Sequence, residues 1–356
     1  MKTVLFVLPY PPNQAPSQRF RVEAYFPLLK QNNIKFHCQY FLDQEAWRAL
    51  YKQGSVFKKS MAVFKGVLKR KFLLLKIHRY DYIFIHREAA SVGPPFFEWF
   101  VSKVFRKKII FDFDDAIWIP NVSENNRMAR YIKSFWKIRY ICKWAHKISA
   151  GNQYLLNWVS QYNKNLVLNP TCVDMHDKYV PVKTQSDRPL VIGWTGSHST
   201  MKYLDIILPV LKRLEKKHDF VFMVISNENP KIDLQSFRFL PWKEATEIRD
   251  LMNFHIGIMP LENDAWSEGK CGFKIIQYLS LGIPAVASPV GVNTTIIDQS
   301  QSGFLCSGEE EWESALELLI QDEQKRSAFG SYGKHRMQHN FSIESNSSNF
   351  LSLFSS

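Results

Sequence analysis

Short apolar runs alternate with longer amphipathic stretches along the whole chain. In the first half, these runs predict strands at residues 2–8, 34–40, 82–85, 108–111, 147–150 and 165–168. In the second half, they predict strands at residues 190–192, 220–225, 237–240, 256–259, 285–287 and 304–306. Helical patterns lie between them, for example over residues 19–31. Because strands that alternate with helices form parallel sheets, we predict an α/β protein with two doubly wound, Rossmann-like domains that face each other across a cleft.

A polar stretch separates the two series of strands. Residues 174–188 are polar, contain Pro181 and are followed by Pro189, a composition typical of a linker. The C-terminal residues are rich in Ser and Asn but include Phe350 and Phe354, which indicates a helix that packs back on the body. We therefore expect an N-terminal domain (1–175), a linker (176–188), a C-terminal domain (189–335) and a packed tail (336–356).

The stretch of residues 268–288 combines a glycine-rich loop, a short helix and a buried strand. Gly269 and Gly272 let the backbone approach a ligand at points where a Cβ atom would collide. Lys270 and Lys274 are four residues apart, so on a helix they share one face near its N-terminus. Free N–H groups, the helix dipole and two ammonium groups together favour a diphosphate. The alternative is a solvated helix with two surface lysines.

Polar side chains follow three predicted strands of the first half. They are Arg19 and Arg21 after the first strand and its loop, His86, Arg87 and Glu88 after the third, and Asp114 and Asp115 after the fourth. Ligands of parallel sheets bind at the carboxyl ends of the strands, so these side chains are candidates for the rim of a cleft. Paired carboxylates can orient hydroxyls, act as a base, hold a divalent ion, or cap a helix. For the histidine, the alternatives are a hydrogen-bond donor in the cleft and a satisfied core residue, and the arginines can equally be helix-surface charges.

The composition indicates full hydrophobic cores and an acidic partner. Apolar residues make up 46% of the 356 residues, and the net charge of +13 favours anionic lipid, nucleic acid or phosphorylated substrates. The cysteines are scattered without a CxxC pair, so we expect a reducing compartment and neither a disulfide framework nor a zinc site. We expect neither a secretion signal nor a membrane span, because no apolar run reaches the roughly 18 residues that a span needs.

Two segments mix basic and aromatic residues and are candidates for contact with a membrane. Residues 52–79 interleave lysines with phenylalanines, as amphipathic segments on anionic bilayers do. Residues 130–140 add aromatic side chains that suit the headgroup zone. The alternative is a pair of ordinary domain helices with a basic outer face.

Several short motifs occur in a fixed order along the chain. In the second half they are Gly193-Trp194-Thr195-Gly196-Ser197, Pro260-Leu261, Gly269-Lys270-Cys271-Gly272-Phe273-Lys274, Gln277-Tyr278 and Gly282-Ile283-Pro284. This order resembles the donor domain of GT-B glycosyltransferases, specifically the retaining family called glycosyl transferases group 1. Upstream, His86-Arg87-Glu88 and Phe111-Asp112-Phe113-Asp114-Asp115-Ala116-Ile117-Trp118 are similar to a bacterial branch of that family.

The resemblance implies that the first domain binds an acceptor and the second a nucleoside diphosphate sugar, with no cofactor and no obligatory metal. It implies that Lys274 and Lys270 neutralise the charge that grows on the leaving phosphate. The residues implied in donor binding are Gly193, Thr195, Gly196, Ser197, Trp242, Glu268, Gly269, Cys271, Gly272, Phe273 and Gln277. In the first domain, His86 and Asp115 are expected to take part in catalysis. The residues expected to bind the acceptor are Arg19, Arg21, Arg87, Glu88 and Asp114.

The chain departs from the family pattern at two points. The family has two glutamates in the pattern E-x7-E, of which the first contacts the sugar and the second the ribose. Here Gln277 occupies the second position and Gly269 the first, with Glu268 one residue early. An amide can still hydrogen-bond to ribose hydroxyls, but without charge. The Arg and Lys that many relatives place after the first glycine loop are also missing, which shifts phosphate binding onto Lys270 and Lys274.

We therefore predict a glycosyltransferase that moves a hexose to a hydroxyl of a glycan or lipid-linked acceptor. We expect it in the cytoplasm, at the inner face of the cytoplasmic membrane. The alternatives are a sugar-nucleotide 2-epimerase of the same fold and a non-catalytic GT-B scaffold that has lost the glutamates. A nucleic-acid-binding protein would explain the charge, but it would leave the glycine–lysine loop without a role, so we expect no nucleic acid partner.

Overall fold

The computed structural model describes residues 2–51, 56–120, 133–180 and 189–355. The chain divides into two compact units. The first comprises Met1–Thr171 and Asn346–Ser356, and the second comprises Cys172–Ser345. We expected the second domain to end at residue 335, but this position lies inside helix α16 (Glu323–Asn340), so the second unit continues beyond it. Residues 181–188 of the expected linker lie outside the described residues.

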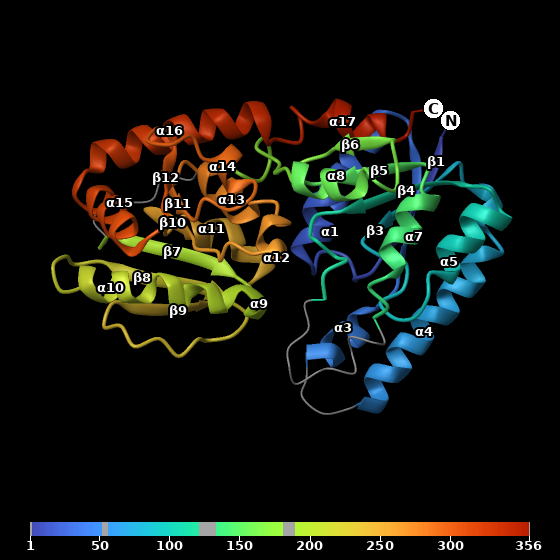
Figure 1. Ribbon diagram of the computed structural model, residues 1–356, viewed down its shortest axis with the longest axis horizontal. Helices are drawn as coiled ribbons and strands as arrows, with labels where there is room; N and C mark the ends of the chain where they lie inside the picture. Colours follow the sequence, from blue (N-terminus) through green and yellow to red (C-terminus); the bar gives the residue numbers. More distant parts are fainter. Residues whose placement is uncertain (1, 52–55, 121–132, 181–188, 356) are drawn as a thin grey trace. The chain divides into compact units, whose positions relative to one another are not determined.

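Each unit of the described chain is built on a six-stranded sheet of parallel strands (Figure 1). The first sheet contains β1 (Thr3–Leu8), β2 (Lys35–Tyr40), β3 (Tyr82–His86), β4 (Lys108–Phe113), β5 (Lys147–Ala150) and β6 (Leu166–Leu168). The second contains β7 (Val191–Gly196), β8 (Val221–Ser226), β9 (Phe237–Pro241), β10 (Ile256–Met259), β11 (Ala285–Ala287) and β12 (Gly303–Leu305). All the strands expected from the apolar runs are present, and the α/β prediction with two Rossmann-like domains is confirmed.

Helices connect the parallel strands in both units. Those of the first unit are α1 (Pro16–Arg21), η1 (Glu23–Tyr25), α2 (Phe26–Gln31), α3 (Gln44–Tyr51), α4 (Val56–Leu74), η2 (Ile77–Arg79), α5 (Phe96–Trp99), the π-helical turn η3 (Phe100–Val104), α7 (Lys137–Trp144), α8 (Gln153–Val159) and α17 (Ser347–Ser352). Those of the second are α9 (His198–Met201), η5 (Lys202–Ile206), α10 (Leu208–Leu214), η6 (Glu244–Thr246), α11 (Glu247–Leu251), α12 (Ala265–Glu268), α13 (Phe273–Ser280), α14 (Asn293–Ile296), α15 (Glu309–Gln321) and α16.

The helix expected over residues 19–31 is divided into three pieces. Helix α1 begins earlier, at Pro16, and its C-terminal cap is Val22, whose ψ of −61° is combined with a φ of −130°. Helix α2 restarts with Pro27 in its first turn, where the missing N–H of proline costs no hydrogen bond. The prediction of one continuous helix was wrong because it ignored the position of this proline.

The strand order of each sheet reverses at one point. The first sheet has the order β2-β1-β3-β4-β5-β6, so the reversal falls between β1 and β3. The second has the order β12-β11-β10-β7-β8-β9, so the reversal falls between β7 and β10. Loops that leave neighbouring strands in opposite directions open a crevice at their carboxyl ends, which is where ligands of such sheets bind. A ligand is therefore expected to bind at the loops after β1 and β3 in the first unit, and at those after β7 and β10 in the second.

Strand β7 shows how the second sheet receives helices on both faces. Ile192 and Trp194 point into a hydrophobic cluster that also contains residues of α10, α15 and α16. Gly193 faces the other way, and a Cβ atom there would lie 2.1 Å from the ring of Phe254. On neighbouring β10, a Cβ atom at Gly257 would lie 2.3 Å from the ring of Tyr278 on α13. The small residues therefore make room for aromatic rings on the second face of the sheet.

The C-terminal residues complete the core of the first unit. The rings of Phe350 and Tyr25 stack with centroids 4.0 Å apart and planes at 6°. Phe354 lies against Phe6 on β1 and Phe84 on β3, with ring centroids 6.3 Å apart in both pairs. Phe350, Leu353 and Phe354 are all fully buried. The tail therefore packs through the aromatic side chains that stood out in its sequence.

None of the helices that the structure describes combines the length and the apolar composition that crossing a bilayer requires.

Candidate active site

The register of three adjacent strands in the first unit brings three polar residues side by side. His86 on β3 is opposite Asp112 on β4, and Asp112 is opposite Ser149 on β5. His86 Nδ1 lies 2.8 Å from Asp112 Oδ2, and the Ser149 hydroxyl donates to Asp112 Oδ1 at 2.6 Å. His86, Asp112 and Ser149 are all fully buried. A carboxylate within a buried strand needs hydrogen-bond or charged partners, and His86 and Ser149 are two of the partners of Asp112.

Arg21 completes this buried network and does not lie at the mouth of a cleft. Its side chain is inaccessible to solvent, its guanidinium forms an ion pair with Asp112, and it also donates to the carbonyl of Asn169. Burial alone would raise the pKa of Asp112, but the Arg21 charge and the His86 hydrogen bond lower it to about 2. The prediction that Arg21 binds the acceptor is replaced by a structural role, because no face of this side chain is open to a ligand.

Ser17 connects the buried network to the surface at the carboxyl ends of β1 and β3. Its hydroxyl donates to Asp114 Oδ1 at 2.7 Å, and its oxygen lies 2.9 Å from His86 Nε2. A hydroxyl has a single proton, so with that proton directed to Asp114, His86 Nε2 is the donor in the second contact. His86 is therefore a hydrogen-bond donor, but one that is enclosed in the core and satisfied by Asp112 and Ser17.

Arg87 holds the two carboxylates that follow β4. Its guanidinium donates to Asp114 Oδ1 at 3.2 Å and to Asp115 Oδ2 at 2.7 Å. The backbone of Arg87 is left-handed, with φ of 62°, and it turns the chain out of β3. The three side chains remain between 13% and 24% exposed. Burial alone would lower the pKa of Arg87, but the Asp115 carboxylate outweighs it and raises the pKa. Arg87 therefore fixes the position of both carboxylates, which are placed to orient a hydroxyl.

The remaining residues expected to bind an acceptor have other partners. Glu88 forms an ion pair of 2.7 Å with Lys137, which is itself buried and donates to the carbonyl of Ala90 at 2.7 Å. The Arg19 guanidinium lies 5.0 Å from the ring centroid of Phe20. Lys137 and Ile138 are buried, so the expectation that residues 130–140 lie on a membrane is wrong for these two. Residues 130–132 of that segment lie outside the described residues.

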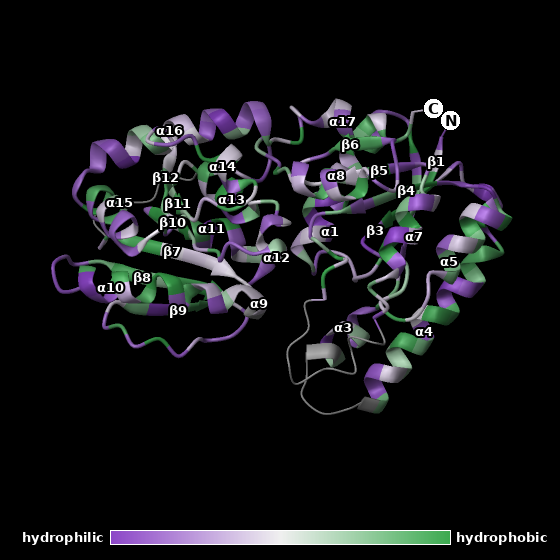
Figure 2. Ribbon diagram, in the orientation of Figure 1, coloured by the Kyte–Doolittle hydropathy of each residue, from purple (hydrophilic) through white to green (hydrophobic). Residues whose placement is uncertain are grey.

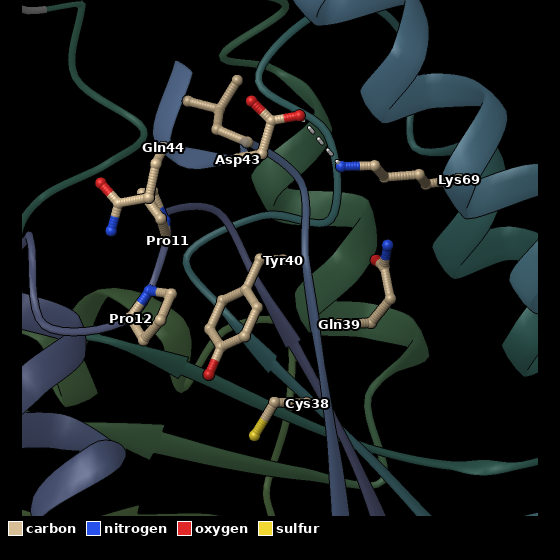
Figure 3. Close-up of a pocket in the computed structure, with 9 residues that line it drawn as sticks. Pro11, Pro12, Cys38, Gln39, Tyr40, Asp43, Gln44 and Lys69 are labelled. Carbon is tan, nitrogen blue, oxygen red and sulfur yellow. Dashed lines mark ion pairs between the residues drawn. The ribbon is translucent and has the colours of Figure 1, made fainter. Parts of the chain in front are cut away.

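A cavity of about 370 Å³ opens beside the carboxyl end of β2 (Figure 3). It is lined by Pro11, Pro12, Cys38, Gln39, Tyr40, Leu42, Asp43, Gln44 and Lys69. Lys69 from α4 and Asp43 approach to 3.6 Å, and burial raises the pKa of the Cys38 thiol to about 11. The lining offers an aromatic ring, amides and a charge pair, which are the groups that bind hydroxyl-rich ligands. No motif in the sequence indicated this pocket, because its residues come from three separate segments.

In the second unit, the glycine–lysine loop leads into α13 through a left-handed turn. Gly272 is the N-cap of this helix and has φ of 63°. A Cβ atom at this position would lie 2.2 Å from Cδ1 of Ile296. Both the backbone angle and the crowding require glycine. The helix therefore begins at a fixed point close behind the loop, as the spacing of the glycines suggested.

Lys270 and Lys274 each lie over an aromatic ring. Lys274 Nζ is 5.5 Å from the ring centroid of Trp194 on β7, and Lys270 Nζ is 5.4 Å from that of Trp266 on α12. Both lysines are partly exposed, whereas Trp194 is buried. A cation over an aromatic face is attracted by the ring, which orients it. Helix α13 follows β10 in the chain and packs on it. It therefore places Lys274 near the end of β7, where the strand order of the second sheet reverses.

The loop after β7 differs in detail from the expected phosphate cradle. The Thr195 N–H donates to the Tyr278 hydroxyl at 3.0 Å, so this amide already has a partner. Gly193 is explained by the ring of Phe254, and a Cβ atom at Gly196 would lie 2.4 Å from the ring of Trp194. Ser197 is exposed at the end of the strand, and its hydroxyl lies 3.0 Å from that of Ser199.

The loop between α12 and α13 uses several of its own groups internally. The Gly269 N–H donates to Trp266 O at 3.2 Å, and Gly269 has an ordinary right-handed φ of −74°. Glu268 ends α12 and is partly exposed. Cys271 is buried, and Phe273 is partly exposed at the start of α13. Of the two glycines in this loop, only Gly272 therefore has a conformation that depends on glycine.

Gln277 lies within a cluster of polar residues around a buried carboxylate. Its amide nitrogen donates to the Tyr179 hydroxyl at 2.7 Å and approaches Glu247 Oε1 at 3.5 Å. The indole N–H of Trp242 donates to the same Glu247 oxygen at 3.3 Å. Glu247 begins α11, shortly after β9, and its residue is 7% exposed. Gln277 and Trp242 were both predicted to contact the donor, and they meet at Glu247.

Sequence reasoning missed Asp112, Ser17, Tyr179 and Glu247. A signal existed for Asp112, because a lone aspartate between Phe111 and Phe113 interrupts a buried strand and must find a cation. No comparable signal exists for Ser17, whose partners His86 and Asp114 are 69 and 97 residues away, or for the approach of Gln277 to Glu247 across 30 residues. Among the described residues, no three His, Cys, Asp or Glu side chains are grouped as metal ligands.

The fold is that of the GT-B glycosyltransferases. Over 99% of this chain it is similar to sucrose-phosphate synthase from Thermosynechococcus elongatus, with 98% of that chain covered, 11% identity and a TM-score of 0.73. It is similar over its full length, and that of the other chain, to Anabaena HepE in complex with UDP and glucose, with 15% identity and a TM-score of 0.67. It is also similar to a glycosyltransferase from Rickettsia africae, with 13% identity, a TM-score of 0.69 and 99% and 97% of the two chains covered.

Within this fold, most of the second unit is similar to one protein family. Residues 189–322 match the family model described as glycosyl transferases group 1. The match confirms the resemblance noted in the glycine–lysine loop and in the loop after β7. No curated protein matches the sequence.

Proposed function

We propose that the protein is a retaining glycosyltransferase that moves a hexose from a nucleoside diphosphate sugar to an acceptor hydroxyl. The observation that carries the proposal is the start of α13, where Gly272 fixes the helix and Lys270 and Lys274 stand beside it over aromatic rings. An N-terminal helix end with two ammonium groups binds a diphosphate. The structure of HepE is a complex with UDP and glucose, which supports a uridine nucleotide as the first to test.

The reaction would break the bond between the anomeric carbon and the diphosphate. The bonding electrons leave with the diphosphate oxygen, which becomes more negative as the bond breaks. Lys274, and Lys270 beside it, would stabilise that growing charge, and this kind of electrostatic assistance is the largest contribution in many enzymes. The acceptor hydroxyl forms the new bond to the anomeric carbon, and its proton passes to an oxygen of the departing diphosphate. The proposal includes neither a cofactor nor a required metal, and activity insensitive to EDTA is its expected consequence.

The ribose and the base would be held by the cluster around Glu247. The family pattern has a ribose-binding glutamate where this chain has Gln277, and in the structure Gln277 directs its amide nitrogen at Glu247. Glu247 would then supply the carboxylate, and Gln277 would orient it. Trp242, whose indole N–H donates to that carboxylate, would lie against the base.

The first unit would bind the acceptor, which is a glycan or a lipid-linked glycan. The cavity beside β2 and the pair of carboxylates held by Arg87 support this role, since both lie at carboxyl ends of strands and both present groups for hydroxyls. His86 and Arg21 would act behind this surface, through Asp112 and Ser17. The net charge of +13 supports a location at the anionic, cytoplasmic face of a membrane.

The direct test is calorimetric binding of UDP, GDP, ADP and CMP to the full chain. Binding of at least one nucleoside diphosphate is expected, and binding of none contradicts the proposal. A protein that binds the nucleotide but neither transfers nor hydrolyses the sugar would instead be the non-catalytic scaffold. Conversion of the donor sugar into its 2-epimer would identify an epimerase.

A further inference from the structure

Exposed apolar side chains are concentrated on one part of the first unit. Among the described residues, fifteen large hydrophobic side chains are exposed, and eleven of them belong to α4 and its C-terminal turn, α5, η3, the residue after η3 or the residue before α7. They are Phe57, Met61, Phe64, Phe72, Leu75, Phe96, Trp99, Phe100, Val104, Phe105 and Trp136. Helix α5 packs against both α4 and α7, so these elements are neighbours in the fold (Figure 1). Patches of this kind mark interaction sites.

Helix α4 and the turn that follows it carry five of these residues in a single stripe, four on the helix and Leu75 in the turn. Phe57, Met61, Phe64, Phe72 and Leu75 recur at helical spacing and are 77%, 40%, 57%, 66% and 72% exposed. At 3.6 residues per turn, they fall within roughly 80° of the helix circumference. Figure 2 shows the resulting alternation of hydrophobic and hydrophilic residues along the whole helix. A stripe this regular would be expected on the buried face of a helix, yet here it is exposed.

The opposite side of α4 already packs on the unit. Ala62, Gly66, Arg70 and Leu73 are buried, and they are centred roughly 160° away from the exposed stripe. Arg70 donates to the carbonyls of Leu8 at 2.9 Å, Gln39 at 3.0 Å and Ala89 at 2.7 Å. These three bonds tie the helix to the carboxyl ends of β1 and β2 and to the segment that follows β3. The rotation of α4 is therefore fixed, and the stripe is held away from the core.

The charges that α4 itself carries have one sign, whereas exposed Asp43 and Glu45 lie on the side of α4 that faces α3, with Asp43 3.6 Å from Lys69. Between residues 56 and 80 the chain contains no aspartate or glutamate. Exposed Lys58, Lys65 and Lys76 lie along one flank of the stripe and Lys71 along the other. On the neighbouring α5, Glu98 is only 2% exposed. The partner must therefore offer both apolar volume and negative charge.

We propose that this surface, made of the α4 stripe with its lysines and the exposed aromatics of α5 and η3, binds an anionic lipid bilayer. Phenylalanine and tryptophan side chains would enter the boundary between headgroups and acyl chains, while lysines contact anionic headgroups. A second copy of the chain fits poorly, because a symmetric contact would bring the same lysines against each other. The stripe lies within the segment 52–79 that the sequence indicated as a membrane candidate, and the exposed residues of α5 and η3 extend it, whereas Lys137 and Ile138 of the second candidate segment are buried.

The surface also indicates which class of acceptor the protein uses, an inference that rests on the proposed transferase function. Lys69 belongs to α4 and lines the cavity beside β2, so one helix contributes to both the docking face and the cavity. An acceptor whose lipid is anchored in the bilayer could present its headgroup to that cavity. The docking face therefore favours a lipid-linked acceptor over a free glycan.

The test is sedimentation of the full chain with vesicles, without donor or acceptor. Vesicles of phosphatidylcholine with about 30% phosphatidylglycerol should bind the protein, and pure phosphatidylcholine should bind it much more weakly. The double variant Phe64→Ser/Phe72→Ser should lose about tenfold or more of its affinity for the anionic vesicles. The variant Lys58→Gln/Lys65→Gln/Lys76→Gln should lose the preference for anionic lipid. A matched control, Leu318→Ser/Tyr332→Ser, removes two exposed apolar side chains of the second unit and should bind as the wild type does.

Three results would overturn the assignment. They are no binding of the wild type to anionic vesicles, equal binding by the phenylalanine variant, and a lipid-free dimer that the phenylalanine variant abolishes. Circular dichroism melts of all variants check that the fold is intact, since every substituted side chain is exposed. UDP affinity measured on the same preparations reports separately on the proposed function, so either inference can fail alone.

Discussion

Gln277 directs its side-chain amide nitrogen at Glu247, 3.5 Å away, within a cluster of polar groups that also contains Trp242 and Tyr179. A glutamate at position 277 would place two carboxylates at this distance, and one of them would be driven toward its neutral form. The neutral amide at 277 and the carboxylate at 247 are therefore compatible as a pair. Exchanging both should preserve the charge of the site.

The first prediction is a charge exchange between these two residues. Gln277→Glu alone should weaken UDP binding about tenfold at pH 7.5, which corresponds to about 1.4 kcal/mol, because of carboxylate repulsion. Glu247→Gln alone should reduce the preference for UDP over 2′-deoxy-UDP, since the ribose contact is lost. The double variant should recover most of the affinity. Calorimetry of the four proteins measures this coupling, and additive losses in the double variant would refute it.

A second prediction concerns Lys274. Lys274→Ala should weaken UDP binding about tenfold but leave uridine binding unchanged, because the lysine would act on the phosphates alone. Lys202→Ala is the matched control, since Lys202 lies in the same unit, is 59% exposed and is 3.8 Å from Glu262. Titration calorimetry with both ligands is the measurement. Equal loss of uridine affinity would mean that the substitution perturbs the fold and not the phosphate site.

The third prediction separates two left-handed glycines. Gly272→Ala should cost about 2–4 kcal/mol in the free energy of unfolding, because the backbone angle is strained and the new methyl group displaces Ile296. Gly282→Ala should cost only about 1 kcal/mol. Its φ of 76° is also left-handed, so the backbone is strained, but beyond the two chain neighbours the nearest heavy atom would lie 3.8 Å from a new Cβ atom, which would not collide. Urea unfolding compares the two, and UDP affinity should fall only for Gly272→Ala. A larger cost at Gly282 would contradict the packing described for α13.

Much of the fold could be predicted from the sequence, because the apolar runs of buried parallel strands are continuous and local. The glycine–lysine loop could also be recognised as a candidate phosphate site, since its glycines and lysines lie within a few adjacent residues. The role of Arg21 was not, because its partner Asp112 is 91 residues away and only the sheet register brings them together. For the same reason, Glu247 could not be paired with Gln277. The sequence left residues 52–79 as either a membrane-contacting segment or an ordinary helix with a basic outer face, and only the packing of the unit shows which side of α4 is exposed.

A fourth prediction follows from the pKa of Asp112. Its folded-state pKa of about 2 lies below the ordinary 3.8, so the network stabilises the fold at pH values above about 4. That contribution, about 2 kcal/mol, is lost as the pH falls from about 4 to 2 and the carboxylate takes up a proton. Asp112→Asn should remove this part of the acid dependence and cost about 3–5 kcal/mol, since the Arg21 charge stays buried without its counter-ion.

Denaturant unfolding between pH 2 and 6 measures the acid dependence. Asp115→Asn serves as the comparison, because the Asp115 side chain is 24% exposed and keeps water as a partner. A similar loss of stability for both variants would contradict the central position of Asp112 in the network.

The stacking of Phe350 on Tyr25 has a consequence for biosynthesis. A ribosome makes β1 to β6 first, but the hydrophobic core of that sheet is closed only when Phe350, Leu353 and Phe354 emerge. The second unit can assemble during translation, since all its strands are available before then. The half of the protein that is synthesised first is thus finished last, and until that moment its sheet keeps an uncovered aromatic face that chaperones can recognise.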